Sequence, residues 1–153
     1  MLKILVMNFF PAFTPPQSGG ELRYFNMYKN LSKYFDITLL SPTYNEHEFE
    51  LIEHSNTFRE YRIPKENIHN EIHWKLEQEE FASEFSALTN AYVGEHFNNY
   101  HKQYLKIYDE IDIIIHDFPY MINYDLFFGI DKKPRIYNSH NLEYDLMSQI
   151  YKG

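Results

Sequence analysis

The sequence predicts an α/β fold of the doubly wound, Rossmann-like type, in which helices cover both faces of a parallel sheet. Short apolar runs alternate along the 153 residues with longer segments in which apolar residues recur every three or four positions. Such alternation of strands and helices is typical of parallel sheets. The run Asp112 to His116 is continuously apolar between its ends, as in strands that are buried on both faces. At this length we expect one domain with its own core.

Each predicted element rests on a local pattern of apolar residues. Strands are predicted at residues 2–8, 36–41, 58–63, 112–116 and 135–138, and helices at 20–34, 72–107, 119–128 and from 141 onward. Pro42 and Pro64 are expected to end the second and third strands, whereas Pro119 suits the first turn of a helix. The apolar stripe of 72–107 loses its register near Gly94, which predicts two helices or one kinked helix. The polar, acidic segment 44–55 is predicted to form an exposed turn or a short helix.

Composition excludes several classes of function. The sequence has no cysteine, which excludes disulfides, thiolate catalysis and zinc–cysteine sites. The formal charge of −8 argues against nucleic acid as a partner, because a nucleic-acid-binding surface needs a basic face. No apolar run approaches the roughly 20 residues of a membrane-spanning helix. The N-terminus enters a strand directly, without the layout of a signal peptide. We therefore expect a cytoplasmic protein.

The loop between the first strand and the first helix is the most informative segment. It contains three prolines, and Gly19 and Gly20 follow it at the start of the helix. The first backbone N–H groups of a helix lack intrahelical partners, and the helix dipole is positive at this end. Glycine lets a ligand approach that backbone without a Cβ in the way. A phosphate site is therefore predicted, although two glycines before a helix can also be a simple turn. Neither G-x-G-x-x-G nor a Walker loop is present.

Polar residues follow two further strands. In a doubly wound sheet ligands bind beyond the carboxyl ends of the strands, so segments 8–20, 116–120 and 138–143 are expected to converge at one edge. His116 and Asp117 end the fourth predicted strand and are candidate site residues, or else a half-buried structural pair.

His140 and Asn141 follow the fifth predicted strand, with Glu143 in the first turn of the next helix. Part of this pattern is structural, because Asn141 can cap the helix and Glu143 suits its dipole. We still favour a functional role for the segment. His69 and His73 have helical i, i+4 spacing but lack the H-E-x-x-H pattern, so no metal site is predicted there.

Three stretches resemble a known family. Residues 3–42, KILVMNFFPAFTPPQSGGELRYFNMYKNLSKYFDITLLSP, resemble the opening of the family 4 glycosyltransferases of GT-B fold. That opening is a strand, a proline-containing loop, a Gly-Gly before the first helix and a second strand. Residues 112–121, DIIIHDFPYM, resemble the end of the family's fourth strand, and residues 137–149, YNSHNLEYDLMSQ, resemble its fifth-strand histidine segment. The order and spacing of these stretches carry the resemblance across the whole chain.

The resemblance implies retaining transfer of a sugar from a nucleotide-sugar donor to an acceptor hydroxyl of a glycan or lipid-linked glycan, with no metal or other cofactor. On this sequence, Gly19 and Gly20 would lie by the donor diphosphate, with Arg23 as a further phosphate partner. His140 would be the catalytic residue beside the donor sugar, with Asn141 and Glu143 in the same segment.

The resemblance also implies an acceptor side. The residues that would face the acceptor are the loop aromatics Phe9, Phe10 and Phe13 together with His116 and Asp117. Aromatic faces suit the apolar C–H surfaces of sugars or a lipid-linked acceptor. Membrane association at the inner face stays open, although no basic amphipathic helix is visible.

The chain departs from the family in extent. A GT-B enzyme has two such domains around a cleft, and the second supplies most donor contacts, including a pair of glutamates in an E-x-x-x-x-x-x-x-E segment. Nothing after Leu142 provides these. We therefore expect residues 1–153 to be the N-terminal, acceptor-side domain, with its own C-terminal domain as a partner, and to be inactive alone. Two rival hypotheses remain: a nucleotide-sugar epimerase on the same fold, and a non-catalytic α/β binding module.

Overall fold

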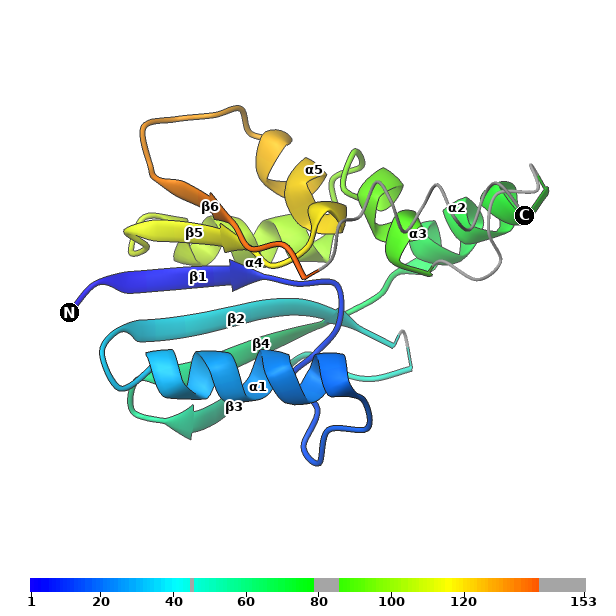
Figure 1. The fold of residues 1–153 in the computed structure, drawn as a ribbon. Helices are drawn as coiled ribbons and strands as arrows, with labels where there is room; N and C mark the ends of the chain where they lie inside the picture. The colour runs from blue at the N-terminus through cyan, green and yellow to red at the C-terminus, as the bar shows by residue number, and fades with distance from the viewer. Residues whose placement is uncertain (45, 79–85, 141–153) are drawn as a thin grey trace.

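The computed structural model describes residues 1–44, 46–78 and 86–140. Its centre is a six-stranded sheet in the order β3-β4-β2-β1-β5-β6 (Figure 1). The strands are β1 (Lys3–Met7), β2 (Asp36–Thr43), β3 (Glu50–Ser55), β4 (Phe58–Pro64), β5 (Ile113–His116) and β6 (Arg135–Tyr137). All neighbours pair in parallel except β3, which runs antiparallel to β4. The predicted α/β fold with a doubly wound parallel sheet is confirmed.

Helices cover both faces of the sheet. They are α1 (Gly19–Leu31), α2 (Asn67–Gln78), α3 (Ser86–Val93), α4 (Asn99–Tyr108) and α5 (Ile122–Leu126), the last preceded by a 3₁₀ turn at Pro119–Met121. In Figure 1, α1 lies in front of the sheet and α4 behind it, while α2 and α3 lie beyond the carboxyl ends of the strands. No helix in the described part of the chain is both long and apolar enough to cross a membrane.

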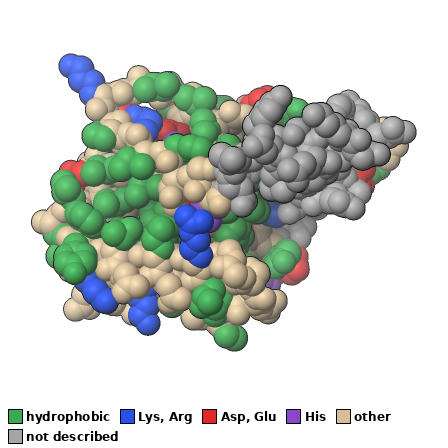
Figure 2. Space-filling view, in the orientation of Figure 1, with side chains coloured by type: hydrophobic (Ala, Val, Ile, Leu, Met, Phe, Trp, Pro, Cys, Tyr) green, Lys and Arg blue, Asp and Glu red, His purple; other side chains and the backbone are tan. Residues whose placement is uncertain are grey.

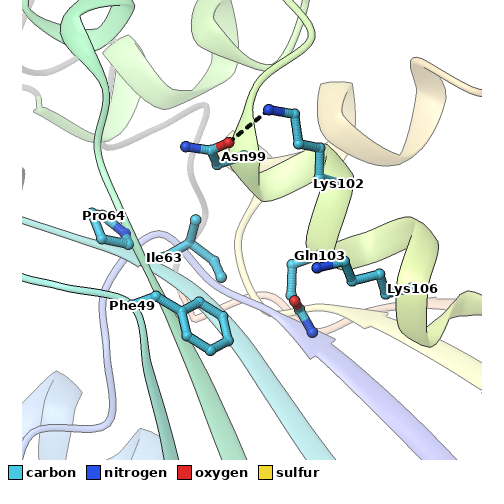
Figure 3. A pocket seen from close by; sticks show the side chains of 7 residues that line it. All are labelled: Phe49, Ile63, Pro64, Asn99, Lys102, Gln103 and Lys106. Carbon is cyan, nitrogen blue, oxygen red and sulfur yellow. Dashed lines mark hydrogen bonds between the residues drawn. The ribbon is translucent and has the colours of Figure 1, made fainter.

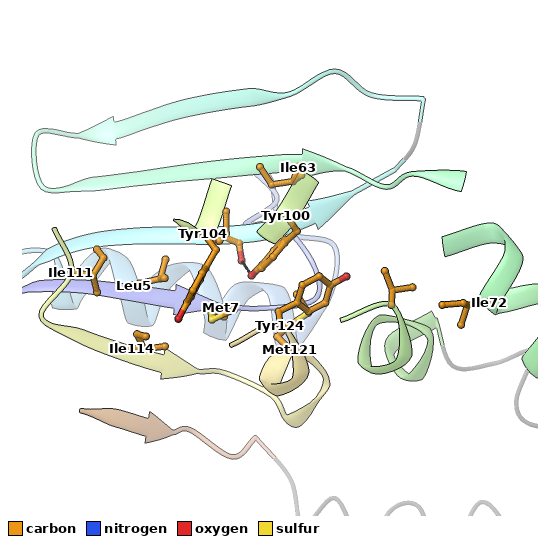
Figure 4. Packing of buried hydrophobic residues seen from close by; sticks show 12 residues of the cluster. Leu5, Met7, Ile63, Ile72, Tyr100, Tyr104, Ile111, Ile114, Met121 and Tyr124 are labelled. Atoms are coloured by element: carbon orange, nitrogen blue, oxygen red, sulfur yellow. Dashed lines mark hydrogen bonds between the residues drawn. The ribbon is translucent and has the colours of Figure 1, made fainter. Parts of the chain in front are cut away.

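The core has two halves because successive strand residues point to opposite faces. On β1, Leu5 and Met7 pack into the cluster beneath α4, whereas Ile4 and Val6 pack beneath α1. Figure 4 shows the α4 half, in which buried tyrosines reach the sheet. There the hydroxyl of Tyr100 donates to the Leu40 carbonyl at 2.9 Å, so the ring is buried without losing its hydrogen bond.

Segment 44–55 is only in part the predicted turn: the His47 N–H donates to the Tyr44 carbonyl at 3.1 Å, but β3 occupies the second half of the segment. The acidic residues that suggested a turn lie opposite arginines of β4. Glu53 is the register partner of Arg59, and the Glu50 carboxylate lies 3.6 Å from the Arg62 guanidinium. Opposite charges across a strand pair stabilise the ladder, and a charged edge strand also resists pairing with other chains.

Pro42 does not end β2, as the prediction had it. The strand continues to Thr43, and Pro42 is the register partner of Ile63 on β4. β1 pairs with β2 only as far as Leu40, so no β1 residue faces Pro42. A proline costs no ladder hydrogen bond where its nitrogen lacks a neighbouring strand. Pro64, by contrast, does close β4.

The predicted helical stretch 72–107 begins earlier, at Asn67, and its described parts lie in α2, α3 and α4. The break near Gly94 is confirmed. A Cβ atom on Gly94 would come within 2.9 Å of the backbone nitrogen of Tyr124, so only glycine fits this approach. The helix predicted at 119–128 is shorter and begins as a 3₁₀ turn. The helix predicted from 141 onward lies outside the described residues.

Candidate active site

The candidate site lies where the strand order reverses. The chain leaves β1 for β2 on one side and later returns to β5 on the other side, and ligands of open α/β sheets bind at such a switch point. The loops after β1 and β5 meet there, with the rings of Phe9 and Phe118 centred 5.0 Å apart. The segment after β6 joins them through His140, which stacks on Phe118 at 4.2 Å. The predicted convergence of these three segments at one edge is therefore observed.

Asp117 is the polar centre of this edge. The residue is fully buried, and its carboxylate accepts three side-chain hydrogen bonds. Tyr28 of α1 donates at 2.5 Å, Asn138 at 2.7 Å, and the His140 ring lies at 2.8 Å through Nε2. Burial and the Asp117 carboxylate raise the pKa of the Tyr28 hydroxyl, which keeps it protonated as a donor. Three elements far apart in sequence are thus held on one carboxylate.

Of the two ring nitrogens of His140, only Nε2 bonds to a described residue. Its plane lies 18° from that of Phe118, and its Nε2 faces Asp117. When the neutral ring donates through Nε2, Nδ1 is an acceptor. Nδ1 makes no hydrogen bond to a described residue. A carboxylate that fixes one ring nitrogen also fixes the orientation of the other, and this orientation suits Nδ1 to accept a hydrogen bond from a hydroxyl.

His116 does not share a site with Asp117. The two residues are consecutive at the end of β5, so they point to opposite faces of the sheet. The buried His116 ring lies 2.9 Å from Asp125 through Nε2. Arg135 donates twice to the same carboxylate, at 2.7 and 2.9 Å, and Tyr104 donates at 2.6 Å.

Despite burial, hydrogen bonds from His116, Arg135 and Tyr104 hold the pKa of Asp125 well below its usual range. His116 is therefore enclosed in an ionic cluster between β5, β6 and α5.

Gly19 and Gly20 lie at the first turn of α1, as predicted. The Ser18 hydroxyl caps the helix by accepting the Glu21 N–H at 3.2 Å. A Cβ atom on Gly19 would have no heavy atom within 4 Å, and one on Gly20 would meet only the Ser18 hydroxyl at 3.9 Å. The space beside both residues is open. Arg23, one turn further on, is exposed, and its charge opposes the rise in the pKa of the Tyr28 hydroxyl.

The loop aromatics line a cavity of about 140 Å³ at the same edge of the sheet. Its walls include Phe9, Phe10 and Phe13, with Lys65 on the far side. The Asn8 side chain fixes the first turn of the loop, because it accepts the Phe9 N–H at 2.9 Å and donates to the Phe10 carbonyl at 3.1 Å. Burial lowers the pKa of the Lys65 ammonium. The cavity could hold a small ligand with an apolar face.

Sequence reasoning missed Glu60, which anchors this loop. Glu60 is fully buried, accepts the Ala12 N–H at 2.7 Å and bonds to Arg62 at 3.1 Å. Arg62 also donates to the Ala12 carbonyl at 3.2 Å. Burial acts to raise the pKa of Glu60, but the hydrogen bonds from His54, Arg62 and Ala12 outweigh it and lower the pKa. The sequence did contain one indication. Glu60 lies two residues after Phe58 in a predicted strand, so both side chains are expected on the same, core-facing side of the sheet.

Two of the predicted site residues, Asn141 and Glu143, lie outside the described residues. Within 1–44, 46–78 and 86–140, no group of three or more His, Cys, Asp or Glu side chains is arranged to hold a metal ion. On the face shown in Figure 2, the Lys and Arg side chains of the described residues are scattered and form no basic patch.

The fold and its edge site define a Rossmann-like α/β domain that solved structures match in fold. One is an E. coli protein described as trehalose-6-phosphate bound with UDP-2-fluoro glucose. It matches with a TM-score of 0.51 and 9% identity over 78% of this chain, which shows similarity of fold alone. This chain spans 28% of that structure's length.

A sucrose-phosphate synthase from Thermosynechococcus elongatus matches over 98% of this chain and 97% of its own, with 13% identity. Its TM-score of 0.29 is too low to support an argument. No protein-family model and no curated protein matches the sequence.

Proposed function

We propose that this chain is the N-terminal, acceptor-side domain of a retaining, metal-independent glycosyltransferase of the family 4 type. It would move a sugar from a nucleotide sugar to a hydroxyl of a glycan or lipid-linked glycan. The observation that carries the proposal is the His140 ring, which Asp117 orients at the switch point of the sheet. A second feature supports it: α1 begins with two glycines that have open space beside them. The similarity of fold to the E. coli structure supports it, and that structure is described as bound with UDP-2-fluoro glucose.

The donor diphosphate would lie against the first turn of α1. As the bond between the sugar and the diphosphate breaks, negative charge grows on the leaving phosphate. The unpaired N–H groups of Gly19 and Gly20 and the positive end of the helix dipole would stabilise that charge. The open space beside both glycines lets phosphate oxygens approach the backbone. Arg23 would add a positive charge from the same helix.

His140 would orient the donor sugar rather than transfer a proton. With Nε2 held by Asp117, its Nδ1 would accept a hydrogen bond from a sugar hydroxyl and fix the face on which the new bond forms. The acceptor would enter past Phe9, Phe10 and Phe13, whose rings offer an apolar surface to the C–H face of a sugar.

The remaining donor contacts would come from a second domain. We propose that such a domain follows in the complete protein and that the 153 residues alone do not catalyse transfer. We also propose that the protein acts in the cytoplasm or at the inner face of a membrane. The coding sequence after Gly153 tests it at once. A second α/β domain with paired glutamates is expected, whereas a stop codon would favour the binding-module hypothesis.

Donor binding by the complete protein is the experimental test. Calorimetric titration with a panel of nucleotide sugars is expected to find one that binds, and Gly20→Val is expected to weaken it at least about tenfold, or about 1.4 kcal/mol. The valine side chain would occupy the space beside the backbone N–H groups.

Asn26→Val is the matched control, because it places the same β-branched residue on the exposed side of α1, away from its first turn. If both variants lost the same affinity for the donor, or if no nucleotide sugar bound, the proposed donor site at the start of α1 would be contradicted. Release of free nucleotide without an acceptor would favour the epimerase hypothesis.

A further inference from the structure

A second cavity lies apart from the candidate active site, between α4 and the end of β4 (Figure 3). Its volume is about 280 Å³. Ile63 and Pro64, the last residues of β4, form one side, and Phe49 stands next to them. The opposite wall is α4. Ligand pockets in proteins typically measure about 300–1,000 Å³, so this cavity is the size for a single ring rather than a nucleotide or an extended chain.

Gln103 is the first sign that the cavity is built for a ligand. The residue is only 8% exposed, and it lines the cavity from α4. Its side-chain amide forms no hydrogen bond with a described residue. The amide atoms are not among the buried polar atoms that lack a partner, so water can reach them from the cavity. A ligand hydroxyl could take the place of that water by donating to the amide oxygen and accepting from the amide nitrogen.

Two lysines give the cavity a positive charge. Lys102 and Lys106 are one turn apart on α4, so both lie on the side of the helix that faces the cavity. The Lys102 ammonium donates to Asn99 at 2.9 Å, and Lys106 forms no ion pair with a described residue. None of the residues that line the cavity is acidic, although the protein carries a formal charge of −8. The local charge therefore favours an anion.

Phe49 supplies an apolar surface opposite these polar groups. It is 52% exposed and sits just before β3, with its ring 6.1 Å from that of Tyr61. Figure 3 shows the Phe49 ring across the cavity from Gln103 and Lys106. The cavity therefore combines an exposed aromatic ring, an amide and two lysines, and it has room for one sugar ring. A sugar has an apolar C–H face and hydroxyl groups, and an acidic sugar adds the anion.

We propose that this cavity binds one residue of an acidic saccharide, a sugar that bears a carboxylate or a phosphate. The C–H face of the sugar packs on Phe49, its hydroxyls bond to Gln103, and its anionic group lies between Lys102 and Lys106. This site does not touch the switch point, and it does not depend on the proposed glycosyltransferase activity. A glycan that fills it could belong to any acidic saccharide that the protein meets.

The test is a two-dimensional NMR titration of the 15N-labelled chain with four probes. Glucuronic acid and glucose 6-phosphate carry the two kinds of anion, methyl glucoside is neutral, and inorganic phosphate lacks the sugar. At least one acidic sugar is expected to shift the amide signals of Phe49 and of residues 99–106, and to bind at least about tenfold more tightly than methyl glucoside. Its affinity should fall as salt is added, because surface charges are screened.

Two variants sharpen the test. Lys106→Met keeps the length of the side chain and removes its charge, and Gln103→Leu removes the amide. Each is expected to weaken binding of the acidic sugar about fivefold or more. Lys75→Met is the matched control, since Lys75 is an exposed lysine of α2 outside the cavity. It should leave the affinity unchanged.

Three results would overturn the proposal. Binding of methyl glucoside as tight as that of both acidic sugars would show that the anionic group of the ligand is not recognised. Equal binding of inorganic phosphate and the acidic sugars would reduce the cavity to a simple anion site. No shift at residues 99–106 with any probe would remove the site altogether. Donor titration of the complete protein is unaffected by all three, so failure here is separate from failure of the proposed glycosyltransferase function.

Discussion

Two histidine–carboxylate pairs flank β5, one on each face of the sheet, and they differ in the charge around the carboxylate. The His116–Asp125 and His140–Asp117 contacts are almost equally short, at 2.9 and 2.8 Å, and both carboxylates are buried. Asp125 also binds the Arg135 guanidinium through two hydrogen bonds. Asp117 instead binds neutral donors, the Tyr28 hydroxyl and the Asn138 amide.

The difference separates a structural cluster from a candidate site. Arg135 neutralises Asp125, and the cluster ties β6 and α5 to β5 without needing any ligand. Asp117 lies at the switch point, where neutral donors hold the carboxylate in place and His140 is its one basic hydrogen-bond partner among the described residues. Burial and short distances alone therefore do not distinguish the two pairs. The charge around each carboxylate and its place in the topology do.

The largest effect is expected from Asp125→Asn. Removal of this buried charge leaves Arg135 without its main partner, and breaking such a pair costs about 3–5 kcal/mol of unfolding free energy. Urea denaturation measures the loss. Asp131→Asn is the matched control, because Asp131 binds Arg135 at 2.8 Å from the exposed side. Exposed pairs contribute about 0–1 kcal/mol, so equal losses in the two variants would contradict the assignment of the buried cluster.

The next largest effect on stability is expected from the titration of His69, a buried histidine of α2. The His69 ring accepts the Glu66 N–H at 3.1 Å, and its burial, with the Lys65 charge nearby, lowers its pKa to about 4. The unfolded chain binds a proton at this residue below about pH 6.5, whereas the folded chain does so only near pH 4. Folding is therefore favoured above pH 6.5, and this stability is lost as the pH falls from 6.5 toward 4.

His69→Gln removes that titration. Urea denaturation at pH 7 and pH 4.5 is expected to show a smaller loss of stability in the variant than in the wild type, by about 2–3 kcal/mol at most. Parallel pH profiles for the two proteins would show that His69 is not buried in its neutral form.

A smaller loss of stability is expected from Asp117→Asn. Two of its three donors are neutral, so the change leaves no strong cation unpaired. The NH2 group of the new asparagine would nevertheless face one of these donors, which is expected to lower the unfolding free energy by about 1–3 kcal/mol. Denaturation alongside Asp109→Asn, an exposed aspartate at the end of α4, gives the comparison. A loss larger than that of Asp125→Asn would reverse the proposed difference between the two pairs.

The sequence allowed most of the fold to be predicted, because apolar periodicity reports burial directly. The apolar runs of β1 and β5 placed two neighbouring strands of the sheet, and the loss of register at Gly94 placed a break between helices. β3 was missed because its acidic residues suggested an exposed turn, whereas they pair with Arg59 and Arg62 of the following strand, β4. Pro42 was misinterpreted because the shorter pairing of β1 is a property of the sheet and not of the local sequence.

The candidate site was less predictable. Topology correctly brought together the segments after β1, β5 and β6, which meet at Phe9, Phe118 and His140. Sequence adjacency suggested that His116 belonged with Asp117, but consecutive strand residues face opposite sides. The anchoring role of Glu60 and the partnerless amide of Gln103 depend on contacts between distant segments, so nothing local could reveal them.

The most direct test of the central claim is the rate of sugar transfer by the complete protein and its His140→Gln variant, with the donor found by titration. The variant should keep its unfolding free energy within about 1 kcal/mol of the wild type, because an amide can replace the hydrogen bond to Asp117. Its kcat/KM is expected to fall about 100-fold, or about 2.7 kcal/mol. An unchanged kcat/KM in a stable His140→Gln protein would contradict the assignment of this edge as the active site.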